Sequence, residues 1–152
     1  MKELKEGNVA PVFEAVTGEG KPVKLADFKG KTVVLYFYPK DNTPGCTVEA
    51  CSFRDNFGKL KKRGVVVLGV SADSAESHAK FAKKFSLPFQ LLSDAGKKIV
   101  NAYGVWVKKK FMGREFMGIE RSTFVIGKNG RIQKIFRKVN PKTHLKELLE
   151  SL

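Results

Sequence analysis

Two strongly apolar runs, separated by a helical segment, place the tightest limit on how this chain can fold. Residues 32–38 are nearly all apolar and rich in β-branched and aromatic side chains, and residues 65–70 are equally apolar. Such runs are typical of strands that are covered on both faces of a sheet. Between them, apolar side chains recur at steps of four and three residues along one helix face: Cys46, Ala50, Phe53, Phe57 and Leu60. A strand, a helix and a second strand predict a parallel pair with a right-handed crossover.

The ends of this first helix can be located from the residues that flank it. Thr43 is a good N-cap, and Pro44 suits the first helical position because its missing N–H would have no partner there. Three basic residues at 61–63 complement the negative end of the helix dipole, and Gly64 ends the helix. The sequence therefore predicts one continuous helix between the two strands.

The rest of the chain supplies further strands and helices around this unit. The segments that we expect are a hairpin of strands at 12–16 and 23–25, a helix capped by Asp73 and carrying His78, a strand at 88–92, a helix capped by Asp94, a hairpin of strands at 121–126 and 131–136 with an Asn-Gly turn, and a last helix from Asn140. Residues 105–120 are expected to form a loop or an irregular strand. The expected fold class is α/β, with a mixed sheet flanked by helices and an N-terminal β-hairpin, in a single domain over residues 1–152.

Charge and composition limit the partners and the compartment. The net charge is +14, which favours acidic partners, but the basic residues are scattered and form no long arm. We therefore expect no specific nucleic-acid binding, and the alternative is a basic nucleic-acid-binding module. The charged start, Met1 to Glu6, lacks the apolar run of a secretory signal, and no apolar run approaches the ~20 residues that span a bilayer. The expected location is the cytoplasm, without membrane association.

The stretch from Pro39 to Cys51 holds both cysteines of the protein. Cys46 falls in the first turn of the predicted helix, just beyond the carboxyl end of a buried strand, where ligands of open α/β sheets bind. Unpaired N–H groups and the positive end of the helix dipole favour a thiolate there. Thr43 has two possible roles, as a cap that accepts the Cys46 N–H or as a site hydroxyl. Pro39, Pro44 and Gly45 would shape the loop and let a small molecule approach the backbone.

Cys51 lies five residues after Cys46. On an intact helix this is a rise of roughly 7.5 Å and a rotation of ~140°, so the Cα atoms would lie roughly 8.6 Å apart, whereas a disulfide needs about 4.4–6.8 Å. Cys51 is then either a core cysteine or one member of a redox pair whose oxidation unwinds the helix locally. The two histidines, His78 and His144, are not spaced as zinc ligands with these cysteines, so we expect no metal. We expect His78 at the edge of its helix's apolar stripe.

The segment Tyr38 to Thr47, followed by Glu49-Ala50-Cys51 and Phe53-Arg54-Asp55, resembles the peroxiredoxins, most closely their bacterioferritin-comigratory-protein or Q-type class. The Pro-x-x-x-Thr-x-x-Cys pattern is matched by Pro39, Thr43 and Cys46. Further matches lie at residues 10–13, 27–30, 103–106, 117–119 and 121–126, so that the resemblance covers nearly the whole chain.

This resemblance implies a thioredoxin-like fold and reduction of hydrogen peroxide and organic hydroperoxides. It implies that Cys46 is the peroxidatic cysteine, that Thr43 and Arg121 hold the thiolate and the peroxide oxygens, and that Pro39 shields the site. It places Cys51 at the resolving position, which suggests an intramolecular disulfide that thioredoxin or a similar dithiol reduces. It implies no cofactor and favours a monomer. The remaining alternative is a redox sensor or thiol-exchange protein that uses the same cysteines without peroxidase turnover.

Overall fold

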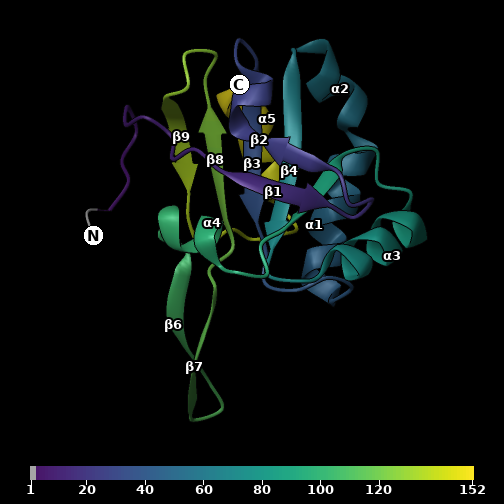
Figure 1. Cartoon of the computed structure of the whole chain (residues 1–152), viewed down its shortest axis with the longest axis vertical. Helices are drawn as coiled ribbons and strands as arrows, with labels where there is room; N and C mark the ends of the chain where they lie inside the picture. Colours follow the sequence, from purple (N-terminus) through teal and green to yellow (C-terminus); the bar gives the residue numbers. More distant parts are fainter. Residues whose placement is uncertain (1–2) are drawn as a thin grey trace.

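The computed structural model describes residues 3–152, so the first two residues of the charged start lie outside the described residues. Its main sheet has seven strands in the order β2-β1-β5-β4-β3-β8-β9, and β6 and β7 form a separate two-stranded sheet (Figure 1). The elements in chain order are β1 Glu14–Thr17, β2 Pro22–Lys24, the 3₁₀ helix η1 Leu25–Phe28, β3 Thr32–Phe37, α1 Pro44–Asp55, α2 Phe57–Lys62, β4 Val65–Ser71, α3 Ala75–Phe85, β5 Gln90–Ser93, α4 Lys98–Ala102, β6 Trp106–Phe111, β7 Arg114–Ile119, β8 Ser122–Ile126, β9 Ile132–Phe136 and α5 His144–Ser151.

The predicted crossover unit forms the middle of the sheet. β3 pairs in parallel with β4 from Thr32 opposite Val65 to Phe37 opposite Val70. β5 continues the parallel arrangement beside β4, whereas β8 pairs antiparallel with β3 on its other edge. The N-terminal hairpin of β1 and β2 and the late hairpin of β8 and β9 also form, which confirms the expected mixed sheet flanked by helices.

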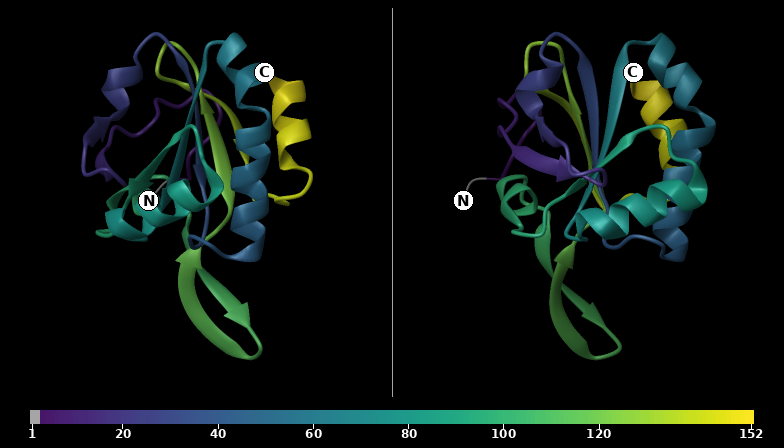
Figure 2. Two further views of the ribbon diagram at one scale, coloured as in Figure 1. Left: turned by 90° about the vertical axis from the view of Figure 1, so that its right-hand side faces the viewer. Right: turned by 45° about the vertical axis from the view of Figure 1, so that its right-hand side comes forward.

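Alternate side chains of β3 point into two different cores, which explains why its sequence is continuously apolar. Val33, Leu35 and Phe37 pack on the face that α4 covers, whereas Val34 and Tyr36 pack on the face that α1, α2, α3 and α5 cover. Figure 2 shows α5 beside α1 on that second face. Both faces of the central strands are therefore dry.

The predicted single helix between β3 and β4 is wrong, because it is interrupted at Asn56. This residue has φ −113° and ψ 12°, which is not helical, and its side-chain amide donates to the Ser52 carbonyl at 3.0 Å. Asparagine competes for nearby backbone groups in this way and so favours helix ends. The apolar stripe continues across the break, so the repeat of apolar residues did not reveal it.

The caps of the next two helices differ in detail from the expectation. Ser74, rather than Asp73, is the N-cap of α3, and its hydroxyl accepts the Ser77 N–H at 3.1 Å. The N-cap residue of α4 is Lys97 rather than Asp94, although the Asp94 side chain accepts the N–H groups of Ile99 and Val100 at 3.2 and 2.8 Å. The last helix begins at His144 rather than at Asn140, after a turn.

The expectation of a loop or irregular strand at 105–120 is wrong. This segment forms a regular antiparallel hairpin, with Trp106 opposite Ile119 and Phe111 opposite Arg114. Met112 and Gly113, both with positive φ, make its turn. The hairpin projects from the body of the molecule (Figures 1 and 2). Within residues 3–152, none of the helices has the length and apolar character needed to cross a membrane.

Candidate active site

The pairing of β3 with β8 brings the two halves of the site together. Cys46 follows the carboxyl end of β3, in the first turn of α1. Because β8 runs antiparallel to β3, with Phe37 opposite Ser122, the residue before β8 lies beside the end of β3. That residue is Arg121, which is 75 positions from Cys46 in sequence.

Cys46 is almost fully buried, at 2% exposure, and its thiol is free. Arg121 Nη2 donates to Cys46 Sγ at 3.2 Å. A guanidinium next to a sulfur stabilises the thiolate, and it adds to the effect of the helix N-terminus. The geometry thus gives the buried sulfur a fixed cationic partner.

Glu49 completes the group around Arg121. It lies three residues after Cys46, so both side chains project from neighbouring positions on one helix face. Arg121 Nη1 donates to Glu49 Oε1 at 2.8 Å, and Glu49 is 1% exposed. Burial raises the pKa of Glu49 to about 7, although the charge and hydrogen bond of Arg121 act in the opposite direction. Sequence reasoning did not single out Glu49, although its spacing from Cys46 was a usable signal.

Thr43 stands at the N-cap position, but its hydroxyl does not cap the helix. The Thr43 Oγ1 donates to the Lys40 carbonyl at 2.8 Å, and only the Thr43 backbone carbonyl joins the helix, accepting the Thr47 N–H at 2.8 Å. Of the two roles considered for Thr43, the side-chain cap on the Cys46 N–H is therefore wrong, because the hydroxyl closes the preceding turn. Its oxygen keeps acceptor capacity toward the site.

Gly45 allows Arg121 to lie close to the helix start. A Cβ atom at Gly45 would stand 3.2 Å from Arg121 Nη2, closer than ordinary van der Waals contact. Pro44 occupies the first helical position, as expected, and is exposed. Pro39 is exposed as well, and its shielding role stays a prediction.

Cys51 lies in the same uninterrupted helix as Cys46 and is half-buried, with a free thiol. The helix that the spacing argument assumed is therefore present. In this conformation the two cysteines occupy different sides of α1, since five residues correspond to ~140° of rotation.

A second polar cluster anchors the loop that precedes α1. Asp41 is buried and accepts from the Tyr38 hydroxyl at 2.5 Å and the Ser77 hydroxyl at 2.8 Å, and it lies 2.7 Å from His78 Nδ1. His78 Nε2 faces the Leu92 carbonyl at 2.9 Å. Both ring nitrogens thus face oxygen atoms. His78 lies on the buried face of α3 together with Phe81, in line with the expected stripe, and its ring nitrogens take part in this polar cluster.

The same cluster contains the acidic and histidine side chains Asp41, Asp73 and His78, which lie close enough to share a metal ion. Asp73 accepts the Asp41 N–H at 2.8 Å and the Ser71 hydroxyl at 2.6 Å. Since protein donors already occupy these oxygens, the cluster is explained as a clamp on the loop from Pro39 to Thr43.

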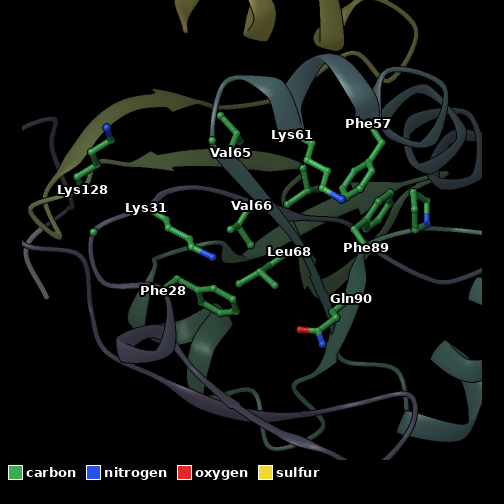
Figure 3. Close-up of a pocket in the computed structure, with 14 residues that line it drawn as sticks. Phe28, Lys31, Phe57, Lys61, Val65, Val66, Leu68, Phe89, Gln90 and Lys128 are labelled. Atoms are coloured by element: carbon green, nitrogen blue, oxygen red, sulfur yellow. The ribbon is translucent and has the colours of Figure 1, made fainter.

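A cavity of about 570 Å³ opens at another part of the molecule, beside the start of β4. Figure 3 shows its apolar lining, which includes Phe28, Val66, Leu68 and Phe89. Its lining includes neither Cys46 nor Arg121, so it is separate from the site described above.

Comparisons with known proteins show which family this chain resembles. The chain matches the AhpC/TSA family over residues 7–135. It is 53% identical over 149 residues to peroxiredoxin Bcp of Bacillus subtilis, covering 98% of this chain and 95% of that protein. It is 46% identical over 144 residues to peroxiredoxin Bcp of Escherichia coli K12, covering 95% and 92%.

Solved structures agree with the sequence relatives. The bacterioferritin comigratory protein of Xanthomonas campestris matches with a TM-score of 0.90 at 34% identity, covering 99% of this chain and 96% of that chain. A PrxQ mutant of Xylella fastidiosa matches with a TM-score of 0.92 at 33% identity, again covering 99% and 96%.

Proposed function

This chain belongs to the AhpC/TSA family, among its Bcp and PrxQ peroxiredoxins, and on that premise we propose that Cys46 reduces hydrogen peroxide and organic hydroperoxides. Members of this group are thiol peroxidases with a thioredoxin-like fold, which is the fold class that the sequence predicted. For the Xanthomonas campestris relative, alkyl peroxide reduction activity has been examined in trapped intermediate and ligand complexes. The observation that carries the proposal is the contact between Arg121 Nη2 and Cys46 Sγ.

The first step is attack of the Cys46 thiolate on a peroxide oxygen. The O–O bond breaks, Cys46 becomes a sulfenic acid, and the departing hydroxide or alkoxide takes up one proton. Arg121 and the N–H groups at the start of α1 stabilise the negative charge that moves along the O–O axis. Thr43 would bind a peroxide oxygen, while Pro39, Pro44 and Gly45 would border the substrate.

The second step is resolution by Cys51. Its thiol attacks the Cys46 sulfenic acid, a disulfide forms and water leaves. Because an intact α1 holds the two cysteines on different sides, the first turns of that helix have to open first. A thioredoxin-type dithiol then reduces the disulfide: its two thiols supply two electrons and two protons, and its own disulfide is the product. The cycle needs no cofactor or metal.

We also propose a compartment and an oligomeric state for this protein. Two free thiols that require a dithiol reductant fit the cytoplasm, where thiols are kept reduced. A net charge of +14 opposes self-association, which fits a monomer. We propose a single domain over residues 1–152, since seven strands join into one main sheet. We assign this charge no specific nucleic-acid partner.

The test is peroxide consumption by the two Cys→Ser variants with dithiothreitol as reductant. We expect Cys46→Ser to be inactive, and Cys51→Ser to lose the intramolecular disulfide that mass spectrometry detects in the native protein after one equivalent of peroxide. Undiminished turnover by Cys46→Ser would refute the assignment. A native protein that reacts once and is not regenerated by the dithiol would instead be a redox sensor.

A further inference from the structure

The projecting hairpin of β6 and β7 concentrates the exposed apolar side chains of this protein. Of the eight large hydrophobic side chains that are exposed in the described part of the chain, four lie within this hairpin: Phe111, Met112, Phe116 and Met117. Isolated two-stranded hairpins are only marginally stable in water, and exposed apolar clusters mark interaction sites. These side chains bury little surface in the folded chain itself, so we looked for a binding partner that would cover them.

The strand register divides the hairpin into two faces. Residues that pair directly across an antiparallel ladder share a face, and successive residues alternate. Lys109 pairs with Phe116, and Phe111 pairs with Arg114. These four residues, which we call the site-facing stripe, therefore lie on one face, whereas Met117 lies on the other.

The stripe begins at the end of the hairpin that leads to Arg121, the residue that contacts Cys46. Arg121 follows β7 after one intervening residue, so the base of the hairpin adjoins the site. Lys109 is half-buried, and burial together with the charge of Arg121 lowers its pKa, while the charges of Glu120 and Cys46 oppose this shift. Lys109 is thus within electrostatic reach of the site, and Phe116, Phe111 and Arg114 continue outward from it along the same face.

The charge of the hairpin selects among the possible occupants. The segment 106–119 has four basic residues and one acidic residue, Glu115, in a chain of net charge +14. Glu115 pairs with Lys108 at 2.7 Å on the face opposite the stripe. The stripe therefore presents two aromatic rings and two cations without a carboxylate. A second copy of this basic chain would be repelled, whereas an acidic surface with an apolar centre would be attracted.

We propose that the site-facing stripe is the docking surface for the dithiol protein that reduces the Cys46–Cys51 disulfide, through an acidic and apolar rim around the thiols of that partner. The inference rests on the proposed function, because a partner is needed only if an external dithiol closes the cycle. The two aromatic rings supply the buried contact, and Lys109 and Arg114 supply attraction and orientation.

The experiment compares two reductants in steady-state turnover of the full-length protein with hydrogen peroxide. One is an acidic thioredoxin with its reductase and NADPH, and the other is dithiothreitol, which needs no docking surface. For the triple variant Phe111→Ser, Phe116→Ser, Arg114→Gln, we expect kcat/KM for thioredoxin to fall about 30-fold or more, the loss typical of removing an aromatic anchor. Turnover with dithiothreitol, and kcat/KM for peroxide, should be unchanged. Higher ionic strength should raise the KM of the native protein for thioredoxin.

Matched variants on the opposite face of the same hairpin serve as controls. Met117→Ser removes an equally exposed apolar side chain, and Lys110→Gln removes one positive charge. Both variants should keep the native kcat/KM for thioredoxin. If either variant lost as much of this kcat/KM as the triple variant does, the assignment to one face would be overturned.

Other outcomes separate the two proposals. If the native protein turns over with thioredoxin and the triple variant does so equally well, the docking surface is refuted and the proposed function stands. If the native protein turns over with dithiothreitol but not with thioredoxin, then thioredoxin is refuted both as the reductant and as the partner of the stripe. A change in kcat/KM for peroxide alone would assign the stripe to substrate binding. A native dimer in sedimentation that the triple variant dissociates would assign it to a second copy.

Discussion

Arg121 Nη2 lies 3.2 Å from Cys46 Sγ, so a fixed cation accompanies the sulfur before any substrate arrives. The other terminal nitrogen of the same guanidinium binds Glu49 at 2.8 Å, which sets the plane of the group. We expect Arg121→Met to lower kcat/KM for peroxide by about 10²–10³-fold, as when one preorganised donor to a developing anion is removed. The measurement is peroxide consumption with dithiothreitol. Arg63→Met should leave this value unchanged, because the Arg63 guanidinium donates to the Leu149 carbonyl at the surface.

Gly45 tests how closely Arg121 has to approach the helix start. In Gly45→Ala the new methyl group would stand 3.2 Å from Arg121 Nη2, so the guanidinium has to move by a few tenths of an ångström. We expect kcat/KM for peroxide to fall about tenfold, because small misplacements of catalytic groups are costly. The matched control is Gly58→Ala in α2, where no atom lies within 4 Å of the new methyl group. It should stabilise the fold by about 0.5–1 kcal/mol without affecting kcat/KM. Native kcat/KM in Gly45→Ala would contradict this view of the contact.

Glu49 and His144 should give the folding stability opposite dependences on pH. Burial raises the pKa of Glu49 from 4.5 to about 7, so its stabilising contribution is present below pH 4.5 and is lost as pH rises toward 7. Burial, with the charge of Arg121, lowers the pKa of His144 from 6.5 to about 4, so its contribution is present above pH 6.5 and is lost as pH falls toward 4. Each effect amounts to about 3 kcal/mol in total. Between pH 4.5 and 6.5 the two should largely cancel.

Single variants separate the two titrations. In urea unfolding, Glu49→Gln should lose stability as pH falls from 6.5 to 4.5, because only His144 still titrates abnormally. His144→Gln should instead lose stability as pH rises over the same interval. Its hydrogen bond to Thr123, 2.8 Å long in the native protein, can be kept by the amide. Identical pH profiles for both variants and the native protein would show that neither group is held in the protonation state inferred here.

Asp41 should be important for stability although its hydrogen bonds are to residues other than Cys46. Asp41→Ala leaves the hydroxyl of Tyr38 and the ring of His78, both buried, without a common acceptor. We expect a loss of about 3 kcal/mol or more in the free energy of unfolding, because a buried polar network that loses one member keeps its desolvation cost. Asp55→Ala, which removes an exposed ion pair with Arg54, should cost less than about 1 kcal/mol. Equal losses in the two variants would show that the clamp is not stabilising.

The centre of the fold could be predicted because its local signals agree. The runs at 32–38 and 65–70 are too apolar for anything but covered strands, and the Pro44 start places Cys46 in a first helical turn. Each of these inferences uses neighbours in sequence only. The position of Cys46 beyond a strand end followed from the same local order.

The residues that surround Cys46 could not be predicted in this way. Arg121 reaches the sulfur only because β8 pairs antiparallel with β3, and no local pattern encodes that pairing. The burial of His78 depends on Asp41 from another element, and the hydroxyl of Thr43 found a closer acceptor than the expected one. The hairpin of β6 and β7 was missed because its lysines and glycines are typical of loops, and its ladder has no buried face to impose an alternating pattern.

The interruption at Asn56 has a consequence for the exchange of backbone amide hydrogens with solvent. It divides the connection between β3 and β4 into two helices. Fraying of α1 from its start at Thr43 therefore need not extend beyond Asp55 into α2. Leu60 stays fully buried on the far side of that boundary. We therefore expect the amides of α1 to exchange more readily than those of α2, which a hydrogen-exchange measurement would test. Opening of the first turns of α1 in the proposed cycle would leave Leu60 of α2 buried and so limit the apolar surface that becomes exposed.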